Sequence, residues 1–340
     1  MNCVKAIICK IYSNFFKKNR PTNQSEPTRL FVIENGFDCF LHNLPTQYLD
    51  FKNYLIERFP DCDIDFDGIL SPTQMPDGDE KYDENELIGA IIRMLDLCAG
   101  ENWCDLEGCL SEAFIHGIVG DNEWLLSPIN LEDDDDDAPF KAVINNEDIS
   151  NDLVGAFRTV RKLFEDWVFN ELPSLDYNKV KKCSIPSFRN GLFLNFNYTP
   201  TLELVYGIHP EQVCHIHGDC RDQSSEIYFG HGNQEEVEVE SCYWGIQDAF
   251  DRLQSELRKN TERALNDNEA FFDKLYGIKD IYSYGFSFSD VDMIYIDRIN
   301  KMVDIRNVVW HFNTYDWEHN QHHIEKIKAY GYNVCKEVAW

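Results

Sequence analysis

Several short apolar runs of this sequence each lead into residues whose types could bind a ligand or transfer a proton. The runs cover residues 30–34, 191–195, 213–217, 226–229 and 280–284. If the runs are parallel strands, the residues after them share one edge of the sheet, where ligands of open α/β proteins bind. The residues that close or follow the runs are Asn35, Gly36, Phe37, Asp38, Asn197, Thr199, His217, Gly230, His231, Gly285, Ser287 and Asp290.

Asn197 and His217 are the strongest candidates for chemistry in this set. An asparagine amide can orient a water molecule or a sugar hydroxyl, and a histidine can accept a proton near neutral pH. Each residue also has a structural explanation, because Asn197 could cap a helix and His217 could be a satisfied buried residue. Taken singly, capping or turn formation explains every member of the set. Convergence on one edge favours the functional interpretation for these two.

The pair Asn35-Gly36 would ordinarily suggest a β-hairpin. No second strand follows it, and residues 47–59 instead have a helical pattern. We therefore interpret the pair as the turn between the first strand and the first helix of a nucleotide-binding sheet. Asp38 then faces the ligand, and the backbone at the helix start receives pyrophosphate. The chain has no P-loop, no GxGxxG and no GxSxG motif.

Helical patterns alternate with apolar runs in the second half of the chain. They cover residues 246–275, 290–303 and 316–330, and further apolar runs lie at 307–312 and 332–338. Strands that alternate with helices predict a parallel sheet covered on both faces. The fold class is therefore α/β, with a Rossmann-like, doubly wound and mainly parallel sheet.

Residues 52–189 separate the first strand from the others and have mainly helical patterns. We expect an α/β domain at 29–340 that this large helical insertion interrupts, and an N-terminal arm and linker at 1–28. Five successive aspartates at 133–137 predict a solvated loop within the insertion. Apolar residues recur at helical spacing at Trp103, Leu106, Leu110, Phe114, Leu153, Phe157, Val160, Phe164 and Val168.

The composition argues against several classes of protein. The net charge of −29 repels nucleic acid, so we do not expect a nucleic-acid partner. No apolar run reaches the roughly 18 residues of a membrane span. Lys10 interrupts the apolar N-terminal segment, which argues against a secretory signal. The twelve cysteines lack paired CxxC spacings, so we expect reduced thiols, a cytoplasmic location and no bound metal.

The sequence blocks resemble those of a known family. NGFD, LPTQYLDF, WCDLE, FNYTPTLE, HIHG, FGHG and YGFSFSDVD occur between residues 30 and 330, in the same order as in the AbiH family of bacteriophage abortive-infection proteins. The same blocks are similar, more distantly, to the nucleotide-binding domain of sirtuins. Glu34 stands where a sirtuin glycine would begin the first turn, and the zinc-binding cysteine pairs of sirtuins are absent.

The resemblance implies roles for particular residues. Asn197 matches the sirtuin asparagine that follows a strand, and His217 matches the catalytic histidine before a glycine. Gly285 and Ser287 match residues that touch the nucleotide. The resemblance therefore implies an anti-phage effector that cleaves NAD between nicotinamide and ribose, with NAD as substrate or ligand. It also implies regulation by a homo-oligomer or by a defence-system partner protein.

Two alternatives remain open at this stage. The first is a non-catalytic nucleotide-binding sensor that acts through the helical insertion, which Glu34 favours. The second is a metal-dependent nuclease or phosphohydrolase, for which the chain offers suitable ligand types, and in which His215 and His217 would point to one face of a strand. Its candidate ligands are Asp38, His215, His217, His231 and Asp290.

Overall fold

A computed structural model gives the fold of this chain. It describes residues 27–63, 70, 73–76, 80–129, 137–183, 188, 191–232, 238–239 and 242–337. The arm and linker predicted for 1–28 and the aspartate loop predicted for 133–137 lie almost entirely outside these residues. No helix of the described residues is long and apolar enough to cross a membrane.

A six-stranded sheet forms the centre of the α/β part, and all of its strand pairs are parallel. The strand order is β5-β4-β1-β6-β7-β8. This is the doubly wound order of a Rossmann-like sheet, so the predicted fold class is confirmed. The strands are β1 (Arg29–Ile33), β4 (Gly191–Asn195), β5 (Val213–His215), β6 (Asp280–Tyr284), β7 (Val309–Phe312) and β8 (Asn333–Lys336).

The central strand β1 is apolar because both of its faces are covered. Leu30 lies between Leu192 of β4 and Ile281 of β6 in the strand register. Side chains alternate between the faces of a strand. Leu30 and Val32 accordingly join one core cluster, whereas Phe31 joins the other. An uninterrupted apolar run is what a strand buried on both faces requires.

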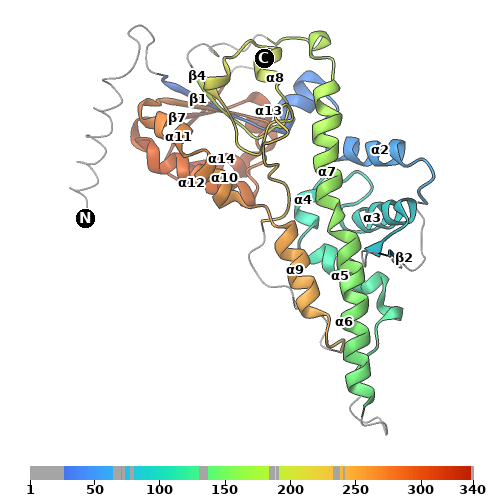
Figure 1. Cartoon of the computed structure of the whole chain (residues 1–340). Helices are drawn as coiled ribbons and strands as arrows, with labels where there is room; N and C mark the ends of the chain where they lie inside the picture. Colours follow the sequence, from blue (N-terminus) through green and yellow to red (C-terminus); the bar gives the residue numbers. More distant parts are fainter. Residues whose placement is uncertain are drawn as a thin grey trace.

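Most helices of the C-terminal half pack against the sheet, whereas α9 lies away from it (Figure 1). The predicted helix at 290–303 corresponds to α12, and the one at 316–330 is divided into α13 and α14. The described C-terminal helices are α9 (Gln247–Leu257), α10 (Thr261–Asp267), α11 (Glu269–Phe272), α12 (Met293–Met302), α13 (Thr314–His319) and α14 (Gln321–Ala329).

Two predictions about this half were wrong. Residues 226–229 do not form a strand. They make one backbone–backbone hydrogen bond to another described segment, from Tyr228 N–H to the carbonyl of His217. The predicted single helix at 246–275 breaks after Leu257. His231 N–H donates to the Leu257 carbonyl, and Lys259 N–H donates to the His231 carbonyl. These distant backbone bonds replace helical ones and bury Lys259 at the break.

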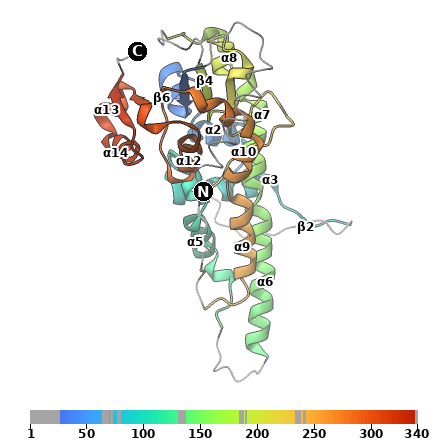
Figure 2. The same cartoon turned by 90° about the vertical axis from the view of Figure 1, so that its left-hand side faces the viewer.

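The segment between β1 and β4 forms a helical extension that projects from the sheet (Figures 1 and 2). Its long helix α6 lies side by side with α9, which comes from the C-terminal half, in both views. The predicted apolar positions are buried, although helix α6 ends before Arg158 and Trp103 lies outside a helix. The helices are α2 (Tyr48–Arg58), α3 (Glu84–Ala99), α4 (Leu106–Cys109), α5 (Glu112–Asp121), α6 (Ala138–Phe157) and α7 (Thr159–Asn170).

Smaller elements complete the described structure. Strands β2 (Thr73–Gln74) and β3 (Glu80–Lys81) form a small antiparallel pair, and α8 covers Thr201–Leu204. A π-helical turn covers Phe37–Leu41. The 3-10 turns are Glu123–Leu125, Leu172–Ser174, Tyr177–Lys179, Pro210–Gln212, Asp273–Gly277, Asp290–Asp292 and Ile305–Asn307.

Candidate functional site

A pocket opens at the carboxyl ends of β1 and β4, where the helical extension meets the sheet. It encloses about 500 Å³, counted out to the open solvent. Its wall combines polar residues that follow the strands with aromatic residues of the extension. The lining residues are Glu34, Asn35, Asp38, Thr46, Tyr48, Glu107, Phe164, Trp167, Leu172, Phe196, Asn197, Tyr198, Thr199, His217 and Lys259.

Asn197 follows β4 and is only 7% exposed. Its backbone is fixed: the N–H donates to the side-chain oxygen of Asn195 at 3.2 Å, and the carbonyl lies 3.1 Å from Nδ1 of His215. Its side-chain amide has no hydrogen-bond partner within the described part of the chain. A fixed backbone with an uncommitted amide in a pocket suits a ligand-binding group.

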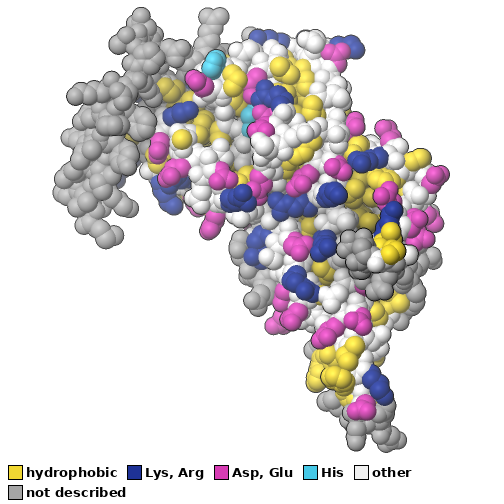
Figure 3. Space-filling model, viewed as in Figure 1, with side chains coloured by type: hydrophobic (Ala, Val, Ile, Leu, Met, Phe, Trp, Pro, Cys, Tyr) yellow, Lys and Arg dark blue, Asp and Glu magenta, His cyan; other side chains and the backbone are white. Residues whose placement is uncertain are grey.

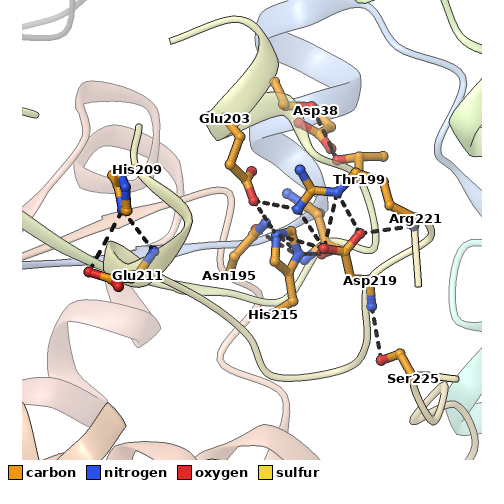
Figure 4. A network of polar contacts seen from close by, with 12 residues as sticks. Asp38, Asn195, Thr199, Glu203, His209, Glu211, His215, Asp219, Arg221 and Ser225 are labelled. Carbon is orange, nitrogen blue, oxygen red and sulfur yellow. Dashed lines mark hydrogen bonds and ion pairs between the residues drawn. The ribbon is translucent and has the colours of Figure 1, made fainter. Parts of the chain in front are cut away.

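The backbone of Asn197 contacts His215. Figure 4 shows His215 within a network of charged side chains that includes Glu203, Asp219 and Arg221. Nε2 of His215 lies 2.9 Å from Glu203, and Arg221 donates to the same Glu203 oxygen at 2.6 Å and also to Asp219. Burial lowers the pKa of His215, but Glu203 and Asp219 outweigh burial and raise it. His215 therefore acts as a donor to the Asn197 carbonyl.

Glu203, His215 and Asp219 are also the described group whose ligand atoms lie close enough to hold a metal ion, within 4.8 Å of one another. The Arg221 guanidinium lies between the two carboxylates and already supplies a positive charge there. His217, His231 and Asp38 do not join this group. The five-residue metal set considered from the sequence is thus not brought together among the described residues.

His217 lines the pocket and is 5% exposed. Its ring packs at right angles on Phe196 and at a tilt on Tyr295. Burial, together with the charge of Lys259, lowers the pKa of His217 to about 4. The imidazole is therefore neutral at pH 7 and can accept a proton.

Lys259 crosses from the helix break into the floor of the pocket, where it is 2% exposed. Its Nζ lies 3.1 Å from Glu107 of α4 and 3.3 Å from Asp292. Burial opposes the charge of the ammonium group, but these carboxylates outweigh burial and raise the pKa of Lys259. One lysine thus joins a carboxylate of the extension to one that follows β6.

Glu34 directs its carboxylate at the turn after β6. One oxygen accepts from the Ser287 N–H at 2.5 Å, and the other lies 3.4 Å from the Ser287 hydroxyl. Burial, reinforced by the charge of Asp292, raises the pKa of Glu34 to about 8. Ser287 is therefore occupied by an acidic side chain of the protein itself, and it does not line the pocket.

Asp38 sits in the π-helical turn and is fully buried. The Thr199 hydroxyl donates to one of its oxygens, and the other oxygen has no partner in the described structure. Burial raises the pKa of Asp38 to about 6. Beside it, Asn35 accepts a hydrogen bond of 2.6 Å from Thr46. These residues form a polar wall of the pocket, as the sequence predicted for Asp38.

Two glycines of the predicted set bring the ends of β1 and β6 into contact. Gly285 has φ of +63°, and a Cβ there would lie 2.5 Å from the Cα of Gly36. The Glu34 N–H also donates to the Tyr284 carbonyl across the same strands. The two backbones approach so closely that a side chain on either residue would clash, so both positions require glycine. The turn therefore forms without a GxGxxG motif.

The other predicted residues lie outside the pocket lining. Phe37 packs against His42, and His231 bonds the Gln254 carbonyl at 2.8 Å through Nε2. Gly230 has φ of +133°, and its N–H lies 3.3 Å from Glu107. The side chain of Asp290 is 96% exposed and pairs with Lys326, so the expectation that Asp290 binds the ligand is not supported.

Sequence reasoning missed several residues at the site, among them Tyr48, Glu107, Lys259 and Asp292. Tyr48 and Glu107 belong to helices α2 and α4, between β1 and β4, for which we predicted no site residue. Lys259 falls within the helix predicted for 246–275, where the pattern did not mark it as a site residue. Asp292 lies two positions after Asp290 in the same 3-10 turn, and the two differ only in that Asp292 is buried and Asp290 is exposed. An acid next to the apolar positions of WCDLE was the one available signal for Glu107.

The strand order and the pocket at the carboxyl edge define an α/β protein of the Rossmann-like class. The model of the family described as bacteriophage abortive infection AbiH matches residues 30–314. The chain therefore belongs to the AbiH family of phage abortive-infection proteins. Neither the curated proteins nor the solved structures contain a match to it.

Proposed function

We propose that this abortive-infection protein hydrolyses NAD at the bond between nicotinamide and ribose. One observation carries the proposal: an uncommitted Asn197 amide and a neutral His217 line the same pocket. The Asn197 amide is available to a ligand, and a neutral imidazole keeps one ring nitrogen unprotonated. A resident metal is not part of the proposal.

The chemistry needs few groups. Nicotinamide leaves as a neutral molecule, so the departing nitrogen needs no strong acid. As the C1′–N bond breaks, a water oxygen forms a bond to C1′, and the water proton passes to His217. The Asn197 amide would orient that water or a ribose hydroxyl. The pocket is partly closed by aromatic residues, which limits access of other water molecules.

The remaining walls suit the rest of a dinucleotide. Asn35 and Asp38 offer polar groups to ribose hydroxyls, and Tyr48, Phe164 and Trp167 offer apolar surface to a flat ring.

We place the activity in the cytoplasm, in keeping with the reduced cysteines. On the face drawn in Figure 3, acidic and basic side chains are interspersed. Control by a second copy or by a partner protein belongs to the same proposal.

Glu34 favours a second candidate, a nucleotide sensor without catalysis. Its carboxylate holds the Ser287 N–H, which the sirtuin resemblance assigned to the nucleotide. A bound pyrophosphate would have to compete with that carboxylate. A sensor would bind nucleotide here and signal through the helical extension, with no need for a base.

The deciding experiment incubates purified protein with NAD and follows nicotinamide release by chromatography. We expect release by the wild type and its loss in Asn197→Ala, with NAD binding measured in parallel by calorimetry. Asn170→Ala is the matched control, because Asn170 is an exposed asparagine at the end of α7. Binding without release would favour the sensor, and neither binding nor release would exclude both candidates.

His217→Gln gives an independent prediction. The glutamine keeps a polar side chain of similar reach but cannot act as a base. We expect the rate of nicotinamide release to fall by about 10²–10⁴-fold, the usual contribution of a general base. Thermal unfolding of the variant should stay close to that of the wild type. A variant that retains the wild-type rate would remove His217 from the reaction.

A further inference from the structure

We propose that Asp292 positions His217 for proton transfer: it holds the N–H of Nε2, so that the lone pair of Nδ1 is presented to the pocket. The inference rests on the proposed function, because it assigns the direction of proton transfer in the same site. Asp292 is thus a positioning residue, and His217 is the group that meets the substrate.

The surroundings of Nε2 support this orientation. Nε2 of His217 is completely buried and has no well-aligned hydrogen-bond partner in the described structure, and Oδ1 of Asp292 lies 3.4 Å from it. A neutral imidazole carries one N–H, and its other nitrogen carries a lone pair. A lone pair directed at a carboxylate would be repelled, so the proton belongs on Nε2. The acceptor is then Nδ1, which has no hydrogen-bond partner in the described part of the chain.

Asp292 is itself held in place. It is 2% exposed, and its second oxygen accepts from the Ser289 hydroxyl at 3.0 Å. Lys259 lies 3.3 Å from its first oxygen. Two donors from different segments therefore fix the carboxylate, and the carboxylate in turn limits rotation of the imidazole. This is how a carboxylate that never meets the substrate can set a histidine tautomer.

The charges around His217 come from several elements. Lys259 enters from the break between α9 and α10 and Glu107 from α4, whereas Glu34, at the end of β1, has a pKa of about 8 and is mostly protonated at pH 7. The ammonium group opposes a second positive charge on His217, whereas Asp292 favours it. When His217 takes a proton from water, the Asp292 carboxylate, 3.4 Å from Nε2, stabilises the imidazolium. Its removal should therefore affect the chemical step more than substrate binding.

The kinetic test compares Asp292→Asn with Asp290→Asn. The two aspartates belong to the same 3-10 turn, but Asp290 is exposed and pairs with Lys326. We expect kcat to fall by about 10²–10⁴-fold in Asp292→Asn with little change in KM, as when a carboxylate that orients a histidine is lost. Asp290→Asn should retain the wild-type rate. Equal rates in both variants, or a change confined to KM, would overturn the proposal.

A second measurement does not depend on activity. Nitrogen NMR of ¹⁵N-histidine-labelled wild-type protein at pH 7 distinguishes a protonated nitrogen from one with a lone pair. The His217 signals are assigned by their loss in His217→Gln. We expect a protonated Nε2 and an unprotonated Nδ1. The opposite tautomer would refute the orientation, whereas this tautomer in a protein that does not release nicotinamide would refute only the NAD reaction.

Discussion

Asp38 shows how strongly a single buried acid of the site can affect stability. Its pKa in the folded protein is about 6, above the ordinary value of 3.8. The folded state therefore holds a proton between these values that the unfolded state has lost, so stability falls as pH rises through this window. His217 has the opposite effect in an overlapping window, because burial lowers its pKa to about 4.

The prediction at this scale concerns Asp38→Asn. The asparagine cannot ionise, so the variant should lack the fall in stability that Asp38 causes. We expect its free energy of unfolding, relative to wild type, to increase by about 2 kcal/mol between pH 4 and pH 7. Urea unfolding across this range measures the difference, with exposed Asp290→Asn as control. A difference that does not change with pH would contradict the raised pKa.

Residue type and position were enough to find Asn197 and His217 from the sequence, because both directly follow strands. They were not enough to separate Asp290 from Asp292. Both aspartates occur in one short turn, and one pairs with an exposed lysine while the other is buried beside Lys259. Sequence spacing does not reveal which side of such a turn meets the core.

At the scale of elements, the contact between the β1 and β6 turns depends on Gly36 and Gly285. We predict that Gly285→Ala destabilises the protein by about 1–3 kcal/mol more than Gly207→Ala does. Both glycines have positive φ, of +63° and +70°, so both alanines are strained. Only Gly285 has backbone atoms where the new methyl group would lie. Urea unfolding of the two variants measures this; equal losses would mean that the strands separate easily.

The elements were predictable where local pattern determines them. Strands β1, β4 and β6 appear within a residue of their predicted bounds, since each is a compact apolar run. The break in the helix at 246–275 was not predictable, because it depends on an isolated β-bridge between Arg258 and His231. His231 lies 27 residues earlier in the chain. Residues 226–229 have strand-like composition, but among the described residues they make one backbone–backbone hydrogen bond to another segment, from Tyr228 N–H to the His217 carbonyl.

At the scale of the whole molecule, Lys259 joins the helical extension to the sheet through Glu107 and Asp292. We predict that Lys259→Met destabilises the protein by about 3–5 kcal/mol, because it leaves buried carboxylates without a counter-charge. Lys301→Met is the control, since Lys301 is exposed on α12, and it should change stability by less than about 0.5 kcal/mol. Denaturant unfolding at pH 7 compares them. A small loss for Lys259→Met would mean that the carboxylates take up protons instead.

The central position of β1 has a consequence for synthesis on the ribosome. Its neighbours in the sheet, β4 and β6, begin at Gly191 and Asp280. Strand β1 is therefore synthesised long before the two strands that pair with it. At a translation rate of about 5–20 residues per second, the interval before β6 emerges is on the order of 10–50 s. Asn197, His217 and Asp292 cannot assemble earlier. A nascent chain or a product truncated before Asp292 therefore lacks the complete pocket, and the site can assemble only after the β6 turn has left the ribosome.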